Sequence, residues 1–362
     1  MGLRVRVIDT GLRAGTDNIA FDAAMTALHA QGAIPDTIRF LRFKPTALVG
    51  RHQAISREIK VAYARAHGIG VARRITGGGA IYFDEGMLGW ELVMSRRRLG
   101  LPTLAETAAK LCTAAAEGLS RAFGIDARFR PRNDIEVAGR KLSGTGGFFD
   151  GDTLFYQGTV LIDTDPAAVM ACLNVPRAKL EKRALDRPEA RIVTLAELLG
   201  TAPDHEEVAR AIAAGLCRGL GIEADRAMPS EEEEKRAREI ETRHVGTRAF
   251  IYDIDQQEGA DVATGSASGA GGSVTAFIRT EGPAGAPRIR EALITGDFFV
   301  TPARLIMDLE AALRGVGVAE AGQAVEAFFA AARPDMISLS ASDFRAAIER
   351  ALGADETRAA RS

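Results

Sequence analysis

Apolar residues recur along the first 220 positions with two different periods. Short runs of alternating or clustered apolar residues predict strands, and longer stretches with an apolar stripe predict helices. The expected strands lie at residues 5–9, 38–43, 47–49, 71–72, 80–83, 89–94, 127–131, 133–137, 140–144 and 153–163. The expected helices lie at residues 19–31, 56–67, 103–123, 166–173, 193–199 and 206–220. Thr16, Asp17 and Asn18 offer capping side chains to the first helix.

After residue 220 the pattern changes. The acidic run Glu231–Glu234, followed by Lys235 and Arg236, predicts a solvated helix face or a linker. Further strands are expected at residues 249–254, 273–279 and 289–293, with a mobile Gly/Ala/Ser stretch at 258–272. Helices are expected at residues 302–313, 319–332 and 341–352. Strands followed by helices suggest a small α+β domain.

At 362 residues, the chain exceeds the usual size of a single hydrophobic core. The change of pattern predicts a large domain over residues 1–225, a charged linker over 226–245 and a smaller domain over 246–355.

Composition excludes several classes of function. A formal net charge of −2 gives no general attraction to nucleic acid or to an anionic membrane. No apolar run approaches a membrane span and the first residues lack a signal-peptide core, so a cytoplasmic location is expected. Three dispersed cysteines and five histidines without ligand spacing predict neither a disulfide framework nor a structural metal site.

The stretch at residues 73–84 carries the first candidate chemistry. Arg73 and Arg74 precede the three glycines Gly77, Gly78 and Gly79, which lead into an apolar strand. Glycine lets the backbone approach a ligand closely, and successive N–H groups in such a turn can bind an anion beside the arginines. A plain glycine turn with solvated arginines is the alternative interpretation.

Two later segments make the first one more specific. Asn133-Asp134-Ile135 is followed by a hairpin that carries Lys141, and Gln157-Gly158-Thr159 begins a strand. Taken in order, the three segments resemble the arginine–glycine motif, the lysine motif and the following strand of lipoate–protein ligase A and its relatives. The Gly-Arg-x-Gln segment that begins at Gly50 also fits this family.

The resemblance implies an α+β fold with a mixed α/β sheet, of the biotin/lipoate ligase type that is like class II aminoacyl-tRNA synthetases. It also implies a small C-terminal α+β accessory domain, because the segment Gly296-Asp297-Phe298-Phe299 is similar to part of that domain in lipoate ligases. The implied reaction activates lipoate or octanoate with ATP and Mg²⁺, and then acylates a lysine of an acceptor lipoyl domain or lipoate-binding protein. No P-loop or complete dinucleotide fingerprint is present, so a nucleotide must be held by other means.

The same resemblance assigns roles to residues. Lys141 would bridge the acyl carbonyl and the α-phosphate as the catalytic residue, and Asp134 would contact Mg²⁺ or the amine. The residues expected to bind the acid or ATP are Arg51, Arg73, Arg74, Gly77, Gly78, Gly79, Ala80, Phe83, Asn133, Asp134, Gly144, Gly158 and Thr159. Phe83 and Met87 replace a histidine and an asparagine of the bacterial ligases, which predicts a more apolar wall at the ligand.

Two other functions remain open at this point. An octanoyltransferase of the same fold would take its acyl group from a thioester and would need a reactive cysteine. No cysteine lies near residues 73–84 or 133–144, although folding could bring Cys172 close. The replacements at Phe83 and Met87 also allow a non-catalytic protein that binds an adenylate or a carrier.

Overall fold

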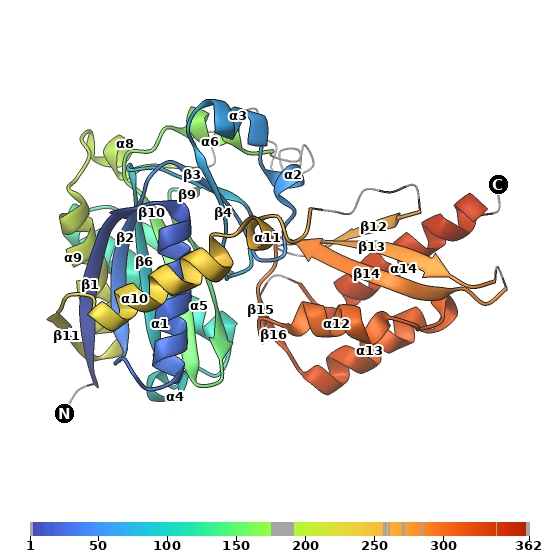
Figure 1. The fold of residues 1–362 in the computed structure, drawn as a ribbon. Helices are drawn as coiled ribbons and strands as arrows, with labels where there is room; N and C mark the ends of the chain where they lie inside the picture. The colour runs from blue at the N-terminus through green and yellow to red at the C-terminus, as the bar shows by residue number, and fades with distance from the viewer. Residues whose placement is uncertain are drawn as a thin grey trace.

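The computed structural model describes residues 3–174, 192–255, 259, 261–269, 272–283, 285–337 and 339–359. Its first part is built on an eight-stranded mixed sheet in the order β11-β1-β2-β6-β10-β9-β8-β7, and a small sheet β4-β3-β5 lies beside it. A separate sheet β12-β13-β14 with three helices forms the C-terminal part (Figure 1). The expected mixed α/β fold is confirmed.

The strands of the first part have the following bounds: β1 Leu3–Arg13, β2 Thr37–Phe43, β3 Thr46–Val49, β4 Gly70–Arg73, β5 Ile81–Phe83, β6 Met87–Ser95, β7 Ala127–Arg130, β8 Asp134–Val137, β9 Arg140–Asp150, β10 Thr153–Leu161 and β11 Ile222–Arg226. Its helices are α1 Gly15–Ala30, α2 Ile55–Glu58, α3 Val61–Ala66, α4 Arg96–Leu99, α5 Leu104–Phe123, α6 Pro166–Cys172, α8 Leu195–Leu199, α9 His205–Leu220, α10 Glu231–Ile240, η2 Glu241–Val245 and α11 Arg248–Ile251. The C-terminal part contains β12 Ala263–Ser268, β13 Ser273–Glu281, β14 Arg288–Gly296, β15 Val300–Thr301, α12 Leu305–Leu313, η3 Val318–Glu320, α13 Ala321–Ala332, β16 Asp335–Met336 and α14 Ala341–Ala359.

Helices cover both faces of the large sheet. α5 and α9 pack on one face around a core that includes Trp90, Leu111 and Leu216. α1 packs on the other face, where Phe21, Met25 and other side chains are buried. Burial on both faces explains why β6 and β10 read as nearly continuous apolar runs.

Most strands and helices of the first part are where the sequence predicts them, but two local predictions are wrong and one strand is missed. The helix expected at 56–67 is two short helices, because Ile59 is extended and pairs with Leu173. α1 begins at Gly15, and the residue before it, Ala14, makes no side-chain cap, so Thr16, Asp17 and Asn18 lie inside the first turn. Strand β11, which pairs in parallel with β1, was not expected.

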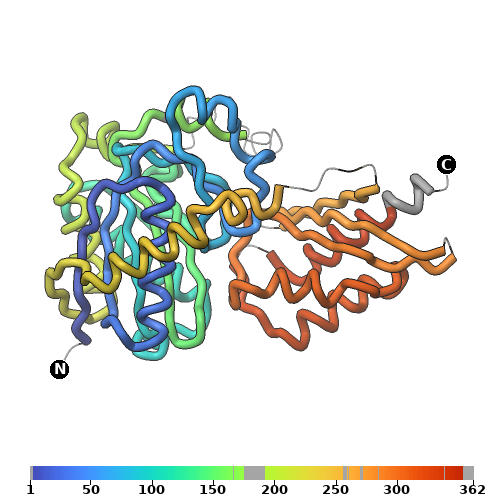
Figure 2. Tube along the Cα trace, in the orientation of Figure 1, coloured from blue at the N-terminus to red at the C-terminus, as the bar shows by residue number. Residues whose placement is uncertain are grey.

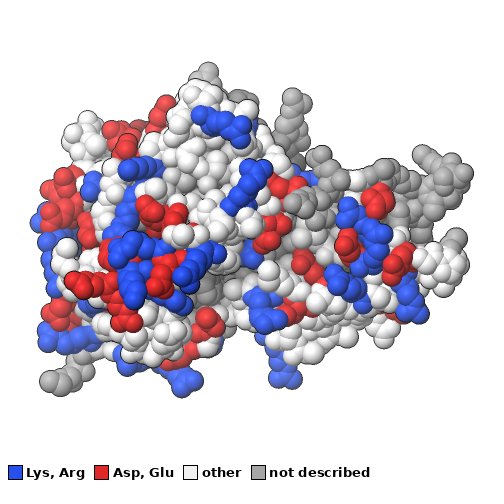
Figure 3. All heavy atoms as spheres, viewed as in Figure 1, with Lys and Arg blue, Asp and Glu red and all other residues white. Residues whose placement is uncertain are grey.

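The charged segment at 231–236 is not fully solvated. It forms α10, which packs against α1, and the Glu233 side chain is completely buried. Glu233 pairs with Arg6, and Glu234 pairs with Arg13. On the face shown in Figure 3, blue and red side chains intermingle over this helix. The segment predicted as a solvated helix face or a linker is therefore held to the first part of the chain by ion pairs.

Two predictions for residues after 245 are also wrong. The strand expected at 249–254 is the short helix α11, capped by Thr247. The stretch expected to be mobile contains strand β12, whose small residues alternate between buried and exposed positions and pair with β13. The prediction for its residues 258, 260, 270 and 271 lies outside the described residues. The domain limits at 225, 245 and 355 stay a prediction.

The C-terminal part touches the first part through the end of β14 and the residues after it. Figure 2 shows the orange strands of the C-terminal part reaching the first part of the chain. Gly296 N donates to His52 O at 2.9 Å, and Phe149 N donates to Thr301 Oγ1 at 3.1 Å. Among the described residues, no helix is both long and apolar enough to cross a bilayer.

Candidate active site

A cavity of about 310 Å³ lies between the large sheet, the small sheet and the glycine segment. Such a volume is at the lower end of the range for small-molecule sites. Its apolar lining residues are Ile19, Leu41, Phe43, Ala80, Ile81, Tyr82, Phe83, Met87, Leu161, Val169, Leu173, Ile192 and Phe299. Its other lining residues are Asp22, Arg74, Gly77, Gly79, Gly89, Glu91, Asn133, Lys141, Gly144, Thr145, Gly146, Gln157, Gly158 and Thr159.

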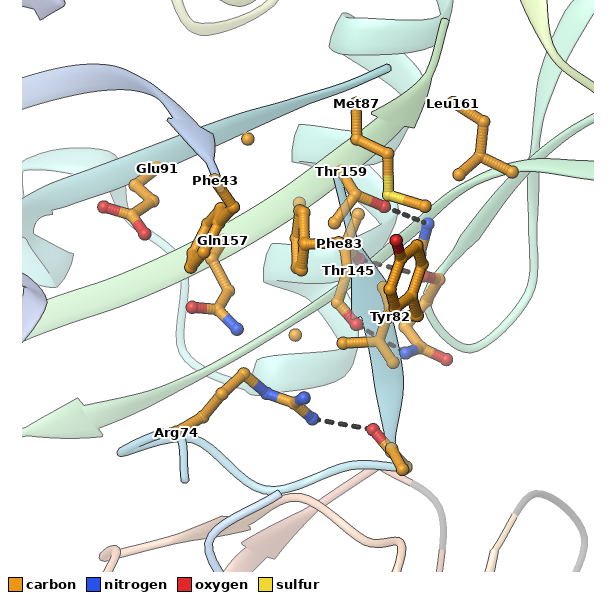
Figure 4. A pocket seen from close by; sticks show the side chains of 18 of the residues that line it. Phe43, Arg74, Tyr82, Phe83, Met87, Glu91, Thr145, Gln157, Thr159 and Leu161 are labelled. Atoms are coloured by element: carbon orange, nitrogen blue, oxygen red, sulfur yellow. Dashed lines mark hydrogen bonds between the residues drawn. The ribbon is translucent and has the colours of Figure 1, made fainter. Parts of the chain in front are cut away.

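Aromatic and aliphatic side chains form one wall of the cavity. The rings of Phe43 and Phe83 stack with centroids 4.3 Å apart, and Met87 and Leu161 lie near them (Figure 4). Phe83 and Met87, the two departures from the bacterial ligase pattern, therefore both face the cavity. This wall can accept an alkyl chain and offers it no polar partner.

The two adjacent arginines diverge because successive residues of an extended chain point to opposite sides. Arg74 lines the cavity, and its guanidinium donates to the carbonyl oxygens of Gly77 (3.1 Å) and Gly79 (2.8 Å) (Figure 4). Burial lowers the pKa of Arg74 to about 10, which leaves it charged near neutral pH. A positive charge is thus fixed at the glycine turn.

Arg73 is placed differently from the prediction. Its side chain is fully buried and donates to the carbonyl oxygens of Gln53, Phe250 and Ile251. Arg51, also expected at the ligand, pairs with Asp253 at 3.0 Å and lies over the Phe250 ring. Neither arginine lines the cavity. Both tie the small sheet to the segment around α11, and their role in ligand binding stays a prediction.

Lys141 is the second residue of β9, directly after the turn of the β8–β9 hairpin, and its side chain lines the cavity. Its Nζ lies 2.9 Å from Asp134 Oδ1, and the other carboxylate oxygen accepts from Arg130 at 2.6 Å. Burial works to raise the pKa of Asp134, but Lys141 and Arg130 outweigh it, so the pKa lies below its ordinary value. The carboxylate therefore stays ionised and positions the Lys141 ammonium group.

Asp134 does not fit the predicted magnesium site. Both of its oxygens already bind cationic side chains, and these would repel a divalent ion. Among the residues that the structure describes, no group of three or more His, Cys, Asp or Glu side chains could hold a metal.

Gly144 leaves the space that the lysine occupies. A Cβ built at this position would lie 2.5 Å from Lys141 Nζ. We expect Gly144→Ala to displace the ammonium group and to slow acyl transfer about 10²-fold, the cost of misplacing a catalytic group by about an ångström. Gly285→Ala is the matched control, because a Cβ there has no neighbour within 4 Å. Equal transfer rates in the two variants, measured by intact mass, would contradict this placement.

The other predicted residues hold the polar floor of the cavity together. Asn133 Nδ2 donates to the carbonyl oxygen of Thr145, and Gly144 N donates to Thr159 Oγ1. Gly158 has no room for a side chain, because a Cβ there would collide with the Trp90 indole. The three predicted motifs therefore meet at one cavity. Gly78, Arg51, Arg73 and Asp134 do not belong to its lining.

Sequence reasoning missed a charged cluster at the wall of the cavity. Arg39 is fully buried and donates to Asp22 (2.6 Å) and Glu91 (2.9 Å), and both carboxyl groups belong to residues of the lining. Burial raises the pKa values of both acids. Arg39, Asp22 and Glu91 lie on three different, largely apolar elements. The register between β2 and β6 pairs Arg39 with Glu91, and the packing of α1 on the sheet adds Asp22.

The sequence also did not predict Phe299 as a site residue. The segment around Phe299 resembles only an accessory-domain feature, yet the Phe299 side chain lines the cavity. No local pattern could have shown this, because the contact depends on how the two parts of the chain dock.

None of the three cysteines lines the cavity. Cys112 Sγ lies 3.3 Å from Oγ1 of the lining residue Thr145, and Cys172 precedes the lining residue Leu173. Burial raises the pKa of Cys112 to about 11, and burial also raises the pKa values of Cys172 and Cys217. All three are thus thiols near neutral pH, the less nucleophilic form.

Comparison with known proteins agrees with this geometry. Residues 14–217 match the family model "Lipoyl protein ligase A/B catalytic domain". A curated relative, octanoyltransferase LipM of Symbiobacterium thermophilum, is 30% identical over 256 residues, which cover 65% of this chain and 93% of the relative.

Two solved structures show the same fold. A lipoate-protein ligase A bound with ATP has a TM-score of 0.60 at 24% identity, covering 70% of this chain and all of its own. LipL1 of P. falciparum in complex with lipoate has a TM-score of 0.70 at 17% identity, covering 90% of this chain and 94% of its own. The second match extends over both parts of the chain.

Proposed function

Because the chain belongs to the lipoyl protein ligase A/B catalytic domain family, we propose that it is an ATP-dependent lipoate–protein ligase. It activates lipoate or octanoate as an acyl-adenylate, and then transfers the acyl group to a lysine of an acceptor lipoyl domain or lipoate-binding protein. The observation that carries this proposal is a cavity whose lining, among the described residues, has an apolar wall, two cationic side chains and no cysteine.

The two ends of the cavity suit the two ends of the substrate. The apolar wall around Phe43, Phe83 and Met87 takes the alkyl chain. Lys141 and Arg74 take the carboxylate and the phosphate that develops negative charge. A carboxylate is already ionised at neutral pH, so the first step needs positioning and charge neutralisation rather than a general base.

ATP supplies the adenylyl group that activates the acid, and Asp134, with both oxygens paired to cationic side chains, does not suit the Mg²⁺ that would accompany the phosphates. Pyrophosphate leaves when the acid attacks the α-phosphorus. In the second step the acceptor amine attacks the acyl carbon and AMP leaves. Lys141 stays a compact positive charge beside the carbonyl and phosphate oxygens through both steps.

The relative from Symbiobacterium thermophilum is named an octanoyltransferase, so transfer from a thioester is the competing reaction. When that reaction uses a cysteine nucleophile, it needs an accessible thiolate. Cys112 and Cys172 are fully buried in this chain, and Cys217 lies on α9, outside the cavity lining. The thiols thus favour the ATP-dependent reaction.

We expect the single variants Cys112→Ala, Cys172→Ala and Cys217→Ala to keep the wild-type rate of lipoylation within about threefold, because none supplies a nucleophile. The assay follows the mass of an apo lipoyl domain after incubation with lipoate, ATP and Mg²⁺. Loss of transfer in one folded cysteine variant, with activity retained in the other two, would identify a thiol nucleophile and support the transferase instead.

A non-catalytic role as an adenylate or carrier-binding protein is the remaining alternative. Lys141 and Arg74 are both present at the cavity, which favours catalysis over binding alone. Release of pyrophosphate from ATP in the presence of lipoate separates the two functions. We also propose that the acceptor is a lipoyl domain or a lipoate-binding protein, and that the reaction takes place in the cytoplasm.

A further inference from the structure

The segment Gly296–Phe299 of the C-terminal part lies on the glycine turn Gly77–Gly79. Gly78 N donates to the carbonyl oxygen of Phe298 at 2.9 Å. The Phe299 ring fills the space beside Gly78, where a built Cβ would lie 2.5 Å from it. The same ring would collide with a Cβ on Gly146. This fit needs glycine on both sides of the ring.

The contact uses the groups that an anion would need. A backbone N–H that already donates to a carbonyl oxygen is not available to a phosphate. Arg74 lies on the same turn, where its guanidinium donates to Gly77 O and Gly79 O. The Gly78 N–H of the turn that the sequence marks as an anion site is therefore already taken by the protein itself.

Several further contacts hold the segment in place. The Phe298 ring stacks on His52 with centroids 5.1 Å apart and packs edge-on against Phe344 in the C-terminal core. Phe149 N donates to Thr301 Oγ1, just after the segment. These contacts with both parts of the chain hold the segment where the Phe299 side chain lines the cavity.

We propose that the segment Gly296–Phe299 competes with the phosphate group of ATP for the glycine turn, so that the two cannot occupy it together. This inference rests on the proposed function, because that function places ATP at the turn. A phosphate that binds there must take the Gly78 N–H from Phe298 O and must displace the Phe299 ring. The affinity for ATP is then reduced by the fraction of molecules in which the segment is docked.

Binding of ATP to the full chain, measured by calorimetry, tests the competition. We expect Phe299→Ala to bind ATP about tenfold more tightly than the wild type, because the docked state loses its ring contact. Thr301→Val should tighten binding in the same direction, since it removes the acceptor for Phe149 N without touching the cavity. Phe328→Ala is the matched control, because it removes a partly buried ring in the C-terminal core and should leave the affinity for ATP unchanged.

Hydrogen exchange gives a second readout that does not depend on turnover. Addition of ATP to the wild type should accelerate exchange in peptides from residues 296–301, since the docked segment is released. Wild-type binding with unchanged or weaker affinity in Phe299→Ala would overturn the competition and leave the proposed function standing. ATP binding by none of these folded variants would instead contradict the proposed function.

Discussion

Lys141→Ala is expected to lower the rate of lipoylation about 10²- to 10³-fold, the loss found when one electrostatic donor is removed from a developing oxyanion. The physical reason is that Lys141 Nζ, held 2.9 Å from Asp134, is the cation on the β9 side of the cavity. Both adenylation and transfer should slow, because both steps develop negative charge at the same oxygens. Pyrophosphate release and acceptor mass measure the two steps separately.

Two variants control this prediction. Lys110→Ala removes an exposed lysine from α5, away from the cavity, and should keep the wild-type rate. Lys141→Arg keeps the charge in a planar group that fits the space beside Gly144 poorly, so we expect only partial activity. A Lys141→Ala protein that keeps both rates would remove the lysine from the mechanism.

The second large effect concerns stability. Arg39→Ala should destabilise the first part of the chain by about 3–5 kcal/mol, because it leaves the buried carboxyl groups of Asp22 and Glu91 without their cation. Urea unfolding followed through Trp90, the only tryptophan, reports on this part of the chain. Arg4→Ala is the control, since its ion pairs are exposed and should contribute at most about 1 kcal/mol.

The stability loss should also depend on pH. Burial raises the pKa values of Asp22 and Glu91 above their unfolded values, so the folded state binds more protons. Protons therefore stabilise the fold, and this contribution is lost as pH rises through the folded pKa values. Without Arg39 the carboxyl groups hold their protons more firmly. We expect Arg39→Ala to be less destabilised relative to the wild type at pH 5 than at pH 8, and the opposite order would contradict the assigned cluster.

The fold was predictable where local pattern and burial agree. The apolar run at Gly89–Met94 is strand β6, buried throughout, and the amphipathic stretch after Thr103 is α5, which that residue caps. The pattern failed where tertiary contacts decide the structure. Ile59 breaks a helical stretch because it pairs with Leu173, and the small residues of β12 form a strand because β13 lies beside them.

The site was predictable from a resemblance rather than from local pattern. Three ordered motifs resemble those of one family, which implied that Lys141, Arg74, Gly77 and Gly79 lie together, and all four line the cavity. The direction of Arg73 depends on strand alternation and on a segment 177 residues away, to which its Nε donates at 3.0 Å. The insertion of Phe299 depends on docking between the two parts. A local sequence pattern predicts neither the direction of Arg73 nor the insertion of Phe299.

The proposed activity is ATP-dependent acylation at this cavity. The most direct test is the intact mass of an apo lipoyl domain incubated with the protein and lipoate, with and without ATP and Mg²⁺, and in parallel with an octanoyl carrier thioester. The proposed function predicts a lipoyl-sized mass gain that requires ATP and no gain from the thioester. An octanoyl gain from the thioester in the absence of ATP would contradict it.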